Sequence, residues 1–349
     1  MRDIKIHFVC RGGVLRSRIA EMYATTHALP SIQVSSSGIE AAKYYSDETY
    51  LAPQAAYIAK VHGLSVLTSP KRSQTTAALL EKSDLIVFLS TDVYITAQEK
   101  FTLNLHKCVV WDVIDWDAAA AKYRLTQGAA SSEIIIEEMY QMITQKLTRL
   151  LVRITESDWV DIVDETNKTL GFRLPIAWAD KYGLWHRGCH AVITTADKRY
   201  IVEKRARRRR FTAGYLDISV CGIASSGENP EQAILREVEK ELGLTAIAAP
   251  LQLLAVYKWH HYHPRYRMHK NMFIYTYHIQ LPVSRPEFIF QKNEVATIRF
   301  LNTPRLRRLL RRNQLRPFGK LQYAYAYYAS MVQLTEELEM AAVPSDQPS

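Results

Sequence analysis

In the first half of the chain, short apolar runs alternate with longer amphipathic segments. The apolar runs predict strands, and the segments in which apolar residues recur every three or four positions predict helices. The predicted strands are 4–9, 32–36, 84–89 and 107–111, and the predicted helices are 17–28, 50–62 and 131–153. Because strands and helices alternate, the pattern favours an α/β fold with a doubly wound parallel sheet and helices on both faces.

The second half contains more strands than helices. Apolar and alternating runs predict strands near 159–164, 190–195, 199–204, 216–221, 252–258, 271–279 and 296–301, with a surface loop at 258–271. Helices are expected from Pro230, from Thr303 and in the Tyr- and Ala-rich segment near the C-terminus. This pattern predicts an α/β/α sandwich with a mixed sheet. We expect one domain at 1–153, a second at 157–340 and a disordered tail at 341–349.

Length and composition permit two domains of ordinary size. The chain has 349 residues and is 48% hydrophobic, which is enough to bury two cores. No apolar stretch approaches 18 residues, so no membrane span is expected. The four cysteines lack metal or disulfide spacing, and we expect a reducing, cytoplasmic location. They are Cys10, Cys108, Cys189 and Cys221.

Positive charge is distributed unevenly along the chain. The net charge is +10, and two arginine clusters, Arg205–Arg210 and Arg305–Arg316, carry much of the excess. Nucleic acid is compatible with such a surface. However, the sequence has no recognition motif with interleaved aromatic residues, and phosphate-bearing small substrates account for the charge equally well. Nucleic acid is therefore the less favoured partner.

The helix predicted from Pro230 carries two carboxylates one turn apart. Glu237 and Glu241 are separated by four residues, so their side chains leave the same face. Two carboxylates this close repel unless a cation lies between them, and Mg²⁺ prefers such oxygen ligands and also binds phosphate oxygens. Asn229 can cap the helix, and Gly243 can end it. The spacing favours a magnesium site over a solvated surface helix.

Residues 222–244 have the spacing G-x5-E-x7-R-E-U-x-x-E-x-G-U, in which U is a large aliphatic residue. The matched residues are Gly222, Glu228, Arg236, Glu237, Val238, Glu241, Gly243 and Leu244. This run resembles the Nudix box, which acts on diphosphates attached to another group. The resemblance implies Mg²⁺ held by Glu237, Glu241 and the Gly222 carbonyl. It also implies that Glu237 is the general base. We take Glu294 as a second candidate for the base, and we expect Arg236 to orient the glutamates rather than to contact substrate. At Lys240 the family usually has a glutamate, so fewer ions are expected to bind here.

The segment before the box resembles type I isopentenyl-diphosphate isomerases and their hydrolase relatives. The shared residues are Lys204-Arg205-Ala206, Arg209-Arg210, Gly214 and Ser219-Val220-Cys221-Gly222. The arginine forks of Arg205, Arg209 and Arg210 suit phosphate oxygens, and the resemblance makes Cys221 a candidate catalytic residue. Ile223 stands where these isomerases have a metal-binding His. The acidic residues that they have on a later strand are also missing, since residues 268–271 here are Met-His-Lys-Asn. We therefore favour a diphosphate hydrolase over an isomerase, with Cys221 as a small buried residue.

A glycine-containing turn follows the first predicted strand and leads into a helix. It reads Cys10-Arg11-Gly12-Gly13-Val14-Leu15-Arg16-Ser17. Successive amides of such a turn and the helix N-terminus face an anion. The residues predicted to bind phosphate through this loop are Arg11, Gly12, Gly13, Val14 and Leu15. The spacing places Cys10 at the bottom of the loop and Arg16 at its rim.

This C-x5-R-S loop resembles that of the low-molecular-weight protein tyrosine phosphatases, and the resemblance covers about residues 1–153. It implies that Cys10 attacks phosphorus as a thiolate, that Arg16 and the amides hold the phosphate oxygens, and that Ser17 donates to the sulfur. Asp115 is then the acid that protonates the leaving group, with Asp117 as the next candidate. No metal is needed for this reaction.

Three positions of this half depart from the family pattern. Gly13 stands where the family has Asn, and Leu15 stands where some members have a second Cys. Trp116 and Ala118-Ala119 replace the Pro and Tyr residues that usually follow the acid. Phosphotyrosine is therefore not assigned as the substrate.

The predicted function is a two-domain phosphohydrolase. One domain would act on a phosphorylated small molecule or phosphoprotein, and the other on a nucleoside or isoprenoid diphosphate. Two alternatives remain, which are isopentenyl-diphosphate isomerase-like activity and a phosphate-binding protein that has lost catalysis. In the second alternative, Lys240 and Gly13 mark the loss.

Overall fold

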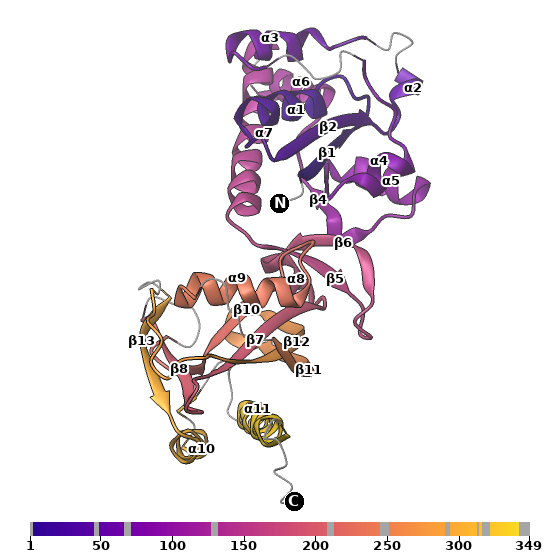
Figure 1. Cartoon of the computed structure of the whole chain (residues 1–349). Helices are drawn as coiled ribbons and strands as arrows, with labels where there is room; N and C mark the ends of the chain where they lie inside the picture. The colour runs from indigo at the N-terminus through magenta and orange to yellow at the C-terminus, as the bar shows by residue number, and fades with distance from the viewer. Residues whose placement is uncertain are drawn as a thin grey trace, which may run out of the picture. The chain divides into compact units, whose positions relative to one another are not determined.

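The computed structural model describes residues 3–44, 49–65, 71–126, 132–207, 213–244, 251–289, 294–312, 314–315 and 322–341. The chain divides into two compact units, Met1–Asp158 and Trp159–Ser349 (Figure 1). The predicted tail lies outside the described residues apart from Ala341. Among the described residues, no helix combines the length and the apolar character needed to cross a bilayer.

The first unit is built on a four-stranded sheet in the order β2-β1-β3-β4. Its strands are β1 (Ile4–Cys10), β2 (Ile32–Gly38), β3 (Leu85–Phe88) and β4 (Cys108–Val110). Every strand is parallel to its neighbour, which confirms the predicted parallel sheet. The carboxyl ends of parallel strands lie along one edge, where open α/β sheets bind their ligands.

Helices cover both faces of this sheet (Figure 1). One face carries α1 (Arg16–His27), α3 (Pro53–Val61) and α7 (Ser132–Thr155), and the other carries α4 (Ala77–Lys82) and α5 (Thr91–Lys100). Shorter elements are α2 (Ala41–Tyr44) and η1 (Leu105–Lys107), and α6 (Trp116–Thr126) packs on α7. Burial of Val9, Phe88 and Val93 joins the sheet to α5.

The second unit contains a seven-stranded sheet with the main order β11-β12-β7-β8-β13, in which β10 pairs with β7 and β9 with β8. The strands are β7 (His186–Thr194), β8 (Tyr200–Arg205), β9 (Leu216–Ile218), β10 (Val220–Ile223), β11 (Gln252–His263), β12 (Met268–Gln280) and β13 (Val295–Leu301). Strands β12 and β7 are parallel, whereas the other pairs are antiparallel. The sheet is therefore mixed, as predicted.

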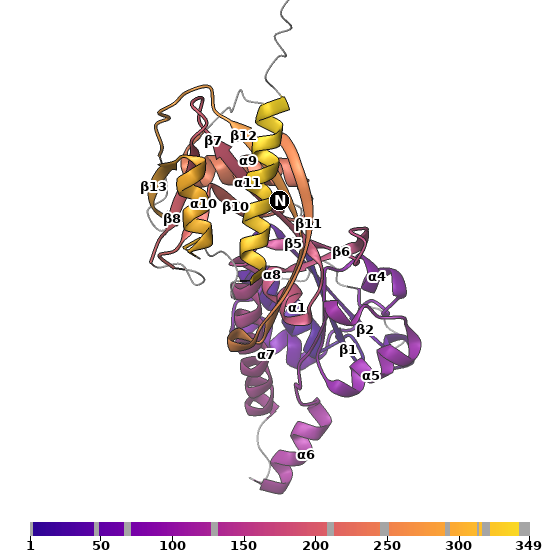
Figure 2. The same ribbon diagram turned by 90° about the horizontal axis from the view of Figure 1, so that it is seen from below.

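Two hydrophobic layers enclose this sheet. Helix α9 (Pro230–Leu242) packs on one face through Ala233, Ile234 and Val238. On the other face, α10 (Thr303–Arg311) and α11 (Gln322–Ala341) contribute residues such as Leu306 and Met331 (Figure 2). These layers form the predicted α/β/α sandwich.

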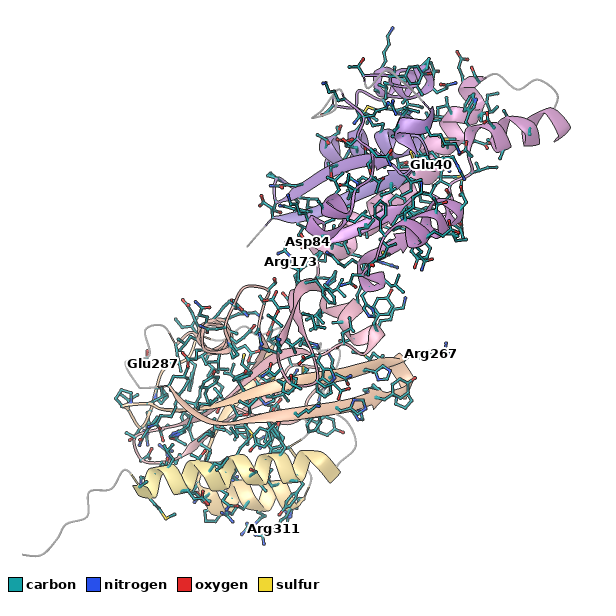
Figure 3. The ribbon with its side chains drawn as sticks, turned by 90° about the vertical axis from the view of Figure 1, so that its right-hand side faces the viewer. Glu40, Asp84, Arg173, Arg267, Glu287 and Arg311 are labelled. Carbon is teal, nitrogen blue, oxygen red and sulfur yellow. The ribbon has the colours of Figure 1, made fainter. Side chains whose placement is uncertain are left out.

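Several elements differ from the sequence prediction. A two-stranded sheet of β5 (Trp159–Val163) and β6 (Thr169–Pro175) precedes α8 (Ile176–Tyr182), and β6, α8, α4 and α5 were not predicted. The prediction of a loop at 258–271 is wrong. Strand β11 continues to His263 and β12 begins at Met268, so only a tight turn remains, with Arg267 at its end (Figure 3).

Candidate active sites

Strand β1 delivers Cys10 to the bottom of a loop that folds back around its sulfur. The backbone amide of Gly13 donates to Cys10 Sγ at 3.2 Å, and Ser17 Oγ lies 3.1 Å from the same sulfur. Cys10 and Ser17 are both buried. These two donors are placed to stabilise negative charge on the sulfur, as the nucleophile of a phosphate-binding loop requires.

The loop crosses the end of β2 at two glycines. Gly13 has φ +70°, a left-handed conformation, and a Cβ on it would lie 2.7 Å from the amide nitrogen of Gly38. A Cβ on Gly38 would lie 2.5 Å from the carbonyl carbon of Gly12. The close approach of the two backbones therefore requires glycine at both positions in this chain. At position 13, where the resembling family has Asn, the loop is thus built without a side chain.

Arg16 is fixed at the rim of the loop by two contacts. Its Nη1 donates to the carbonyl oxygen of Val113 at 2.9 Å, and its Nη2 donates to the carboxylate of Asp115. The Arg16 side chain is 5% exposed, whereas that of Asp115 is 45% exposed. The guanidinium is thus anchored in protein, and its carboxylate partner faces the opening.

These groups line a cavity of about 260 Å³. Its walls combine the loop with the segments that carry Tyr50 and Asp115, and the lining residues are Cys10, Arg11, Gly12, Val14, Leu15, Arg16, Tyr50, Ala52, Gln54, Asp115, Trp116 and Asp117. The structure therefore brings the predicted nucleophile, phosphate-binding loop and both candidate acids together. The Arg11 side chain is engaged separately, because its guanidinium contacts Glu40 and Asp92.

A polar contact that the sequence prediction did not assign joins β1 to β2. His7 is sandwiched between Ser35 Oγ and Ser37 Oγ, each 2.7 Å from a ring nitrogen. Burial lowers the pKa of His7 to about 4, so its ring is neutral near pH 7. The available signal was the polar character of these positions within otherwise apolar strands.

In the second unit, α9 begins and ends as the sequence predicts. Gln232 N donates to Asn229 Oδ1 at 2.8 Å and Asn229 N donates to Gln232 Oε1 at 3.0 Å, which forms a capping box. Gly243 ends the helix at φ 68°. Within this frame, Glu237 and Glu241 are both buried. The two carboxylates are held in protein rather than solvated.

Arg236 connects the loop that precedes α9 to the helix. Its guanidinium donates to both carboxylate oxygens of Glu228, at 2.7 and 2.8 Å, and to the carbonyl oxygen of Ile223 at 3.0 Å. Nη1 also donates to Glu237 Oε1. Arg236 therefore orients the Glu237 side chain, and Glu228 in turn holds the Arg236 guanidinium in place.

Gly222 lies directly beside Glu237. A Cβ at Gly222 would lie 2.3 Å from Cγ of Glu237, so only glycine permits this packing. The structure thereby brings the backbone of Gly222 to the predicted metal-binding carboxylate.

Lys240 lies between two of the acidic residues. Its Nζ donates to Glu237 Oε2 at 3.2 Å and is 3.4 Å from Glu294 Oε1. Burial opposes the charge of Lys240, but the Glu237 and Glu294 carboxylates outweigh it and raise the pKa of Lys240 above its ordinary value. Within the described part of the chain, no three His, Cys, Asp or Glu side chains are grouped to hold a metal ion. The site therefore fits Mg²⁺ only in part. Glu237, Glu241 and the Gly222 carbonyl offer oxygen ligands, but the Lys240 ammonium already contacts Glu237.

Both halves match known families. Residues 5–159 match the family model of the low molecular weight phosphotyrosine protein phosphatases, and residues 184–322 match that of the NUDIX domain. The chain joins a phosphatase domain of this family to a NUDIX domain. The isomerase-like subgroup stays a prediction.

Several curated relatives that match are uncharacterized Nudix hydrolases. One from Rhodococcus erythropolis is 33% identical over 99 residues, which are 28% of this chain and 53% of that protein. YfcD of Escherichia coli (strain K12) is 29% identical over 100 residues, which are 27% of this chain and 52% of that protein. The chain thus spans about half the length of the curated relatives it matches.

Two solved structures are each similar to part of the chain. DR0079 from Deinococcus radiodurans is 20% identical with a TM-score of 0.39, and the match covers 49% of this chain and 98% of that one. Wzb from Vibrio vulnificus, in complex with benzylphosphonate, is 23% identical with a TM-score of 0.35, and the match covers 43% of this chain and 98% of that one.

In the NUDIX domain, Arg205 has partners other than the phosphate that its sequence pattern suggests. Its Nη1 lies 3.4 Å from Glu203 Oε1, 3.3 Å from Asp217 Oδ2 and 3.5 Å from Cys221 Sγ. Because two buried carboxylates hold the guanidinium, Arg205 is part of an internal network. Arg209 and Arg210 lie outside the described residues.

The same network holds Cys221. Burial and the neighbouring Asp217 carboxylate raise the pKa of Cys221 well above its ordinary value, so its thiol is neutral. Tyr328 donates its hydroxyl to Asp217, and Tyr327 contacts His190 Nδ1 at 2.6 Å. The sequence prediction did not find these residues, although a polar Asp217 in a buried strand and a Tyr-rich helix were available signals.

Proposed function

We propose that the chain is a two-domain phosphohydrolase, with a phosphomonoesterase domain at 1–153 and a NUDIX diphosphate hydrolase domain at 157–340. The observation that carries the proposal is the position of the Cys10 sulfur. It accepts a hydrogen bond from Gly13 N at 3.2 Å and lies 3.1 Å from Ser17 Oγ, at the bottom of a cavity that Asp115 also lines. A buried cysteine sulfur, a fixed arginine and an acid in one cavity suit covalent phosphoryl transfer.

In the phosphatase domain, Cys10 attacks the phosphorus of a phosphorylated small molecule or phosphoprotein. The S–P bond forms while the P–O bond to the leaving group breaks. Asp115 gives its proton to the leaving oxygen, and Arg16 and the loop amides hold the remaining phosphate oxygens. Water then attacks the phosphocysteine, gives a proton back to Asp115, and releases phosphate and the Cys10 thiolate. A reactive thiolate of this kind fits a cytoplasmic, reducing location.

The phosphate dianion competes with Asp115 for Arg16. In the structure, the Arg16 guanidinium donates to Asp115. A bound phosphate presents two oxygens to the same fork, which is the geometry that arginine binds best. The incoming substrate therefore releases the Asp115 side chain toward the leaving group, where it acts as the acid in its protonated form.

In the NUDIX domain, the proposed reaction is cleavage of a nucleoside or isoprenoid diphosphate. NUDIX domains generally use Mg²⁺, which Glu237, Glu241 and the Gly222 carbonyl would hold here. When bound, the ion neutralises phosphate oxygens and acidifies water. Arg236 keeps Glu237 in place through its contacts with Glu228 and Ile223 O. Glu237 is the favoured acceptor of the proton from water, and Glu294 is the second candidate.

Two assays on the full chain test both activities. An aryl phosphate is supplied with a chelator, and a panel of nucleoside and isoprenoid diphosphates is supplied with Mg²⁺. Cys10→Ser should remove only the first activity, and Glu241→Gln should remove only the second. Turnover of the aryl phosphate by Cys10→Ser would exclude the covalent mechanism, and undiminished diphosphate cleavage by Glu241→Gln would exclude the proposed metal ligand.

A further inference from the structure

Lys240 places a positive charge among the acidic residues of the NUDIX box. It lies on α9 three residues after Glu237 and directly before Glu241. Its ammonium connects Glu237, at 3.2 Å, with Glu294, at 3.4 Å. Because Glu294 comes from the segment just before β13 and Glu237 from α9, the ammonium joins two different elements of the domain.

The two oxygens of Glu237 are each held by a cation of the chain. Arg236 contacts Oε1, and Lys240 contacts Oε2. A divalent ion between Glu237 and Glu294 would have to bind at the oxygens that the ammonium already contacts. Two positive charges this close repel each other strongly in a partly buried site, so the ion and the ammonium exclude each other.

The surroundings keep Lys240 charged and in place. The Glu237 and Glu294 side chains are only 9% and 16% exposed, whereas that of Lys240 is 39% exposed, so water screens the attraction only in part. Removing the ammonium would leave the buried Glu237 carboxylate and the partly buried Glu294 carboxylate without the cation between them, and such a pair of oxygen ligands suits a divalent ion.

We propose that Lys240 is a built-in cation that replaces one divalent ion between Glu237 and Glu294, so that this domain binds one ion fewer than it would with glutamate at position 240. The inference rests on the proposed function, since it concerns the same site. The proposal concerns the position between Glu237 and Glu294, two carboxylates that the ammonium contacts.

The test counts Mn²⁺ ions bound to the full chain, from the loss of the free-ion paramagnetic resonance signal. Wild type is compared with Lys240→Glu, Lys240→Met and Lys240→Arg. Lys240→Glu should bind one ion more per chain than wild type, whereas Lys240→Arg should match wild type because the charge is kept. Lys60→Met, which removes an exposed positive charge from α3, is the control for net charge and should also match wild type.

Lys240→Met protects the test against misfolding of the glutamate variant. It removes the repelling charge without adding a fourth carboxylate, and its Mn²⁺ affinity should rise about 10-fold above that of wild type. Circular dichroism checks folding. Equal ion number and equal affinity in wild type and every folded position-240 variant would overturn the inference.

Diphosphate hydrolysis is measured on the same preparations to separate the two proposals. If the glutamate variant gains an ion while wild type cleaves no diphosphate, the proposed function of the NUDIX domain fails and the inference about Lys240 is supported. If wild type cleaves a diphosphate but neither Lys240→Glu nor Lys240→Met gains binding, the built-in cation fails and the function stands.

Discussion

Arg16 and Asp115 form an ion pair at the mouth of the phosphatase cavity. Arg16 belongs to the start of α1, and Asp115 directly precedes α6. The pair therefore links the phosphate-binding loop to the segment that carries the candidate acid. Because Arg16 is also held by Val113 O, it is the carboxylate rather than the guanidinium that is free to move when phosphate binds.

The covalent mechanism predicts that Cys10 is indispensable while the other cysteine of this domain is not. Cys10→Ser should lower metal-free turnover of p-nitrophenyl phosphate by about 10³-fold or more, because the thiolate nucleophile is lost. Cys108→Ser is the matched control, since burial raises the pKa of Cys108 to about 11 and keeps that thiol neutral. Similar losses in both variants would argue against Cys10 as the nucleophile.

A second prediction separates the two candidate acids. Asp115→Asn should lower turnover of phenyl phosphate by about 10²-fold or more, because phenolate needs a proton to leave. Turnover of p-nitrophenyl phosphate should fall much less, since that leaving group departs without help. Asp117→Asn should change both rates little, because Arg16 contacts Asp115. The opposite ranking of the two variants would assign the acid to Asp117.

The sequence predicted those parts of both sites that depend on local chemistry. Asn229, Pro230 and Gly243 are local signals for the ends of α9, and the structure places the helix between them. The Cys10 loop is similarly local, because a strand, a glycine turn and a helix follow each other without interruption. Spacing alone sufficed where the interacting residues are close in sequence.

Contacts between distant segments were not predictable in this way. Arg205 is paired with Asp217 and Glu203, and Tyr328 reaches Asp217 from the last helix, so an apparent phosphate-binding arginine is an internal residue. The end of the edge strand β11 was also not predicted. Histidines and aromatic residues occupy both faces of residues 259–263, so the sequence there lacks the alternation of apolar and polar residues that indicates a strand. Tertiary packing decides such positions, and local propensity does not.

A third prediction concerns the close backbone approach at Gly38. Gly38→Ala places a Cβ 2.5 Å from Gly13 N, so the loop must shift. The expected cost is about 1–3 kcal/mol of the free energy of unfolding, together with a large loss of phosphatase turnover. Gly63→Ala is the control, because its Cβ would contact nothing within 4 Å. That variant should lose stability from its positive φ without a comparable loss of activity, and an equal loss of activity in both would refute the role of Gly38.

The last prediction concerns acid stability and His7. Its folded-state pKa is lowered to about 4 by burial, whereas an unfolded histidine titrates near 6.5. The unfolded state therefore binds more protons between these values, and the contribution of His7 to stability is complete above pH 6.5 and lost as pH falls toward 4. Between these pH values, His7 makes the free energy of unfolding rise with pH by up to about 1.4 kcal/mol per pH unit.

Hydrogen exchange of the β1 and β2 amides, corrected for intrinsic rates, measures this slope within the first unit alone. A local probe is needed because buried histidines of the second unit, His190 and His278, also have their pKa lowered to about 4 by burial. His7→Gln can keep hydrogen bonds to Ser35 and Ser37 but takes up no proton. Between pH 4.5 and 6, the free energy of opening should therefore change less steeply with pH in the variant than in wild type. The difference should correspond to the uptake of up to one proton. Equal slopes in wild type and His7→Gln would mean that acid unfolding of this unit is controlled by its carboxylates instead.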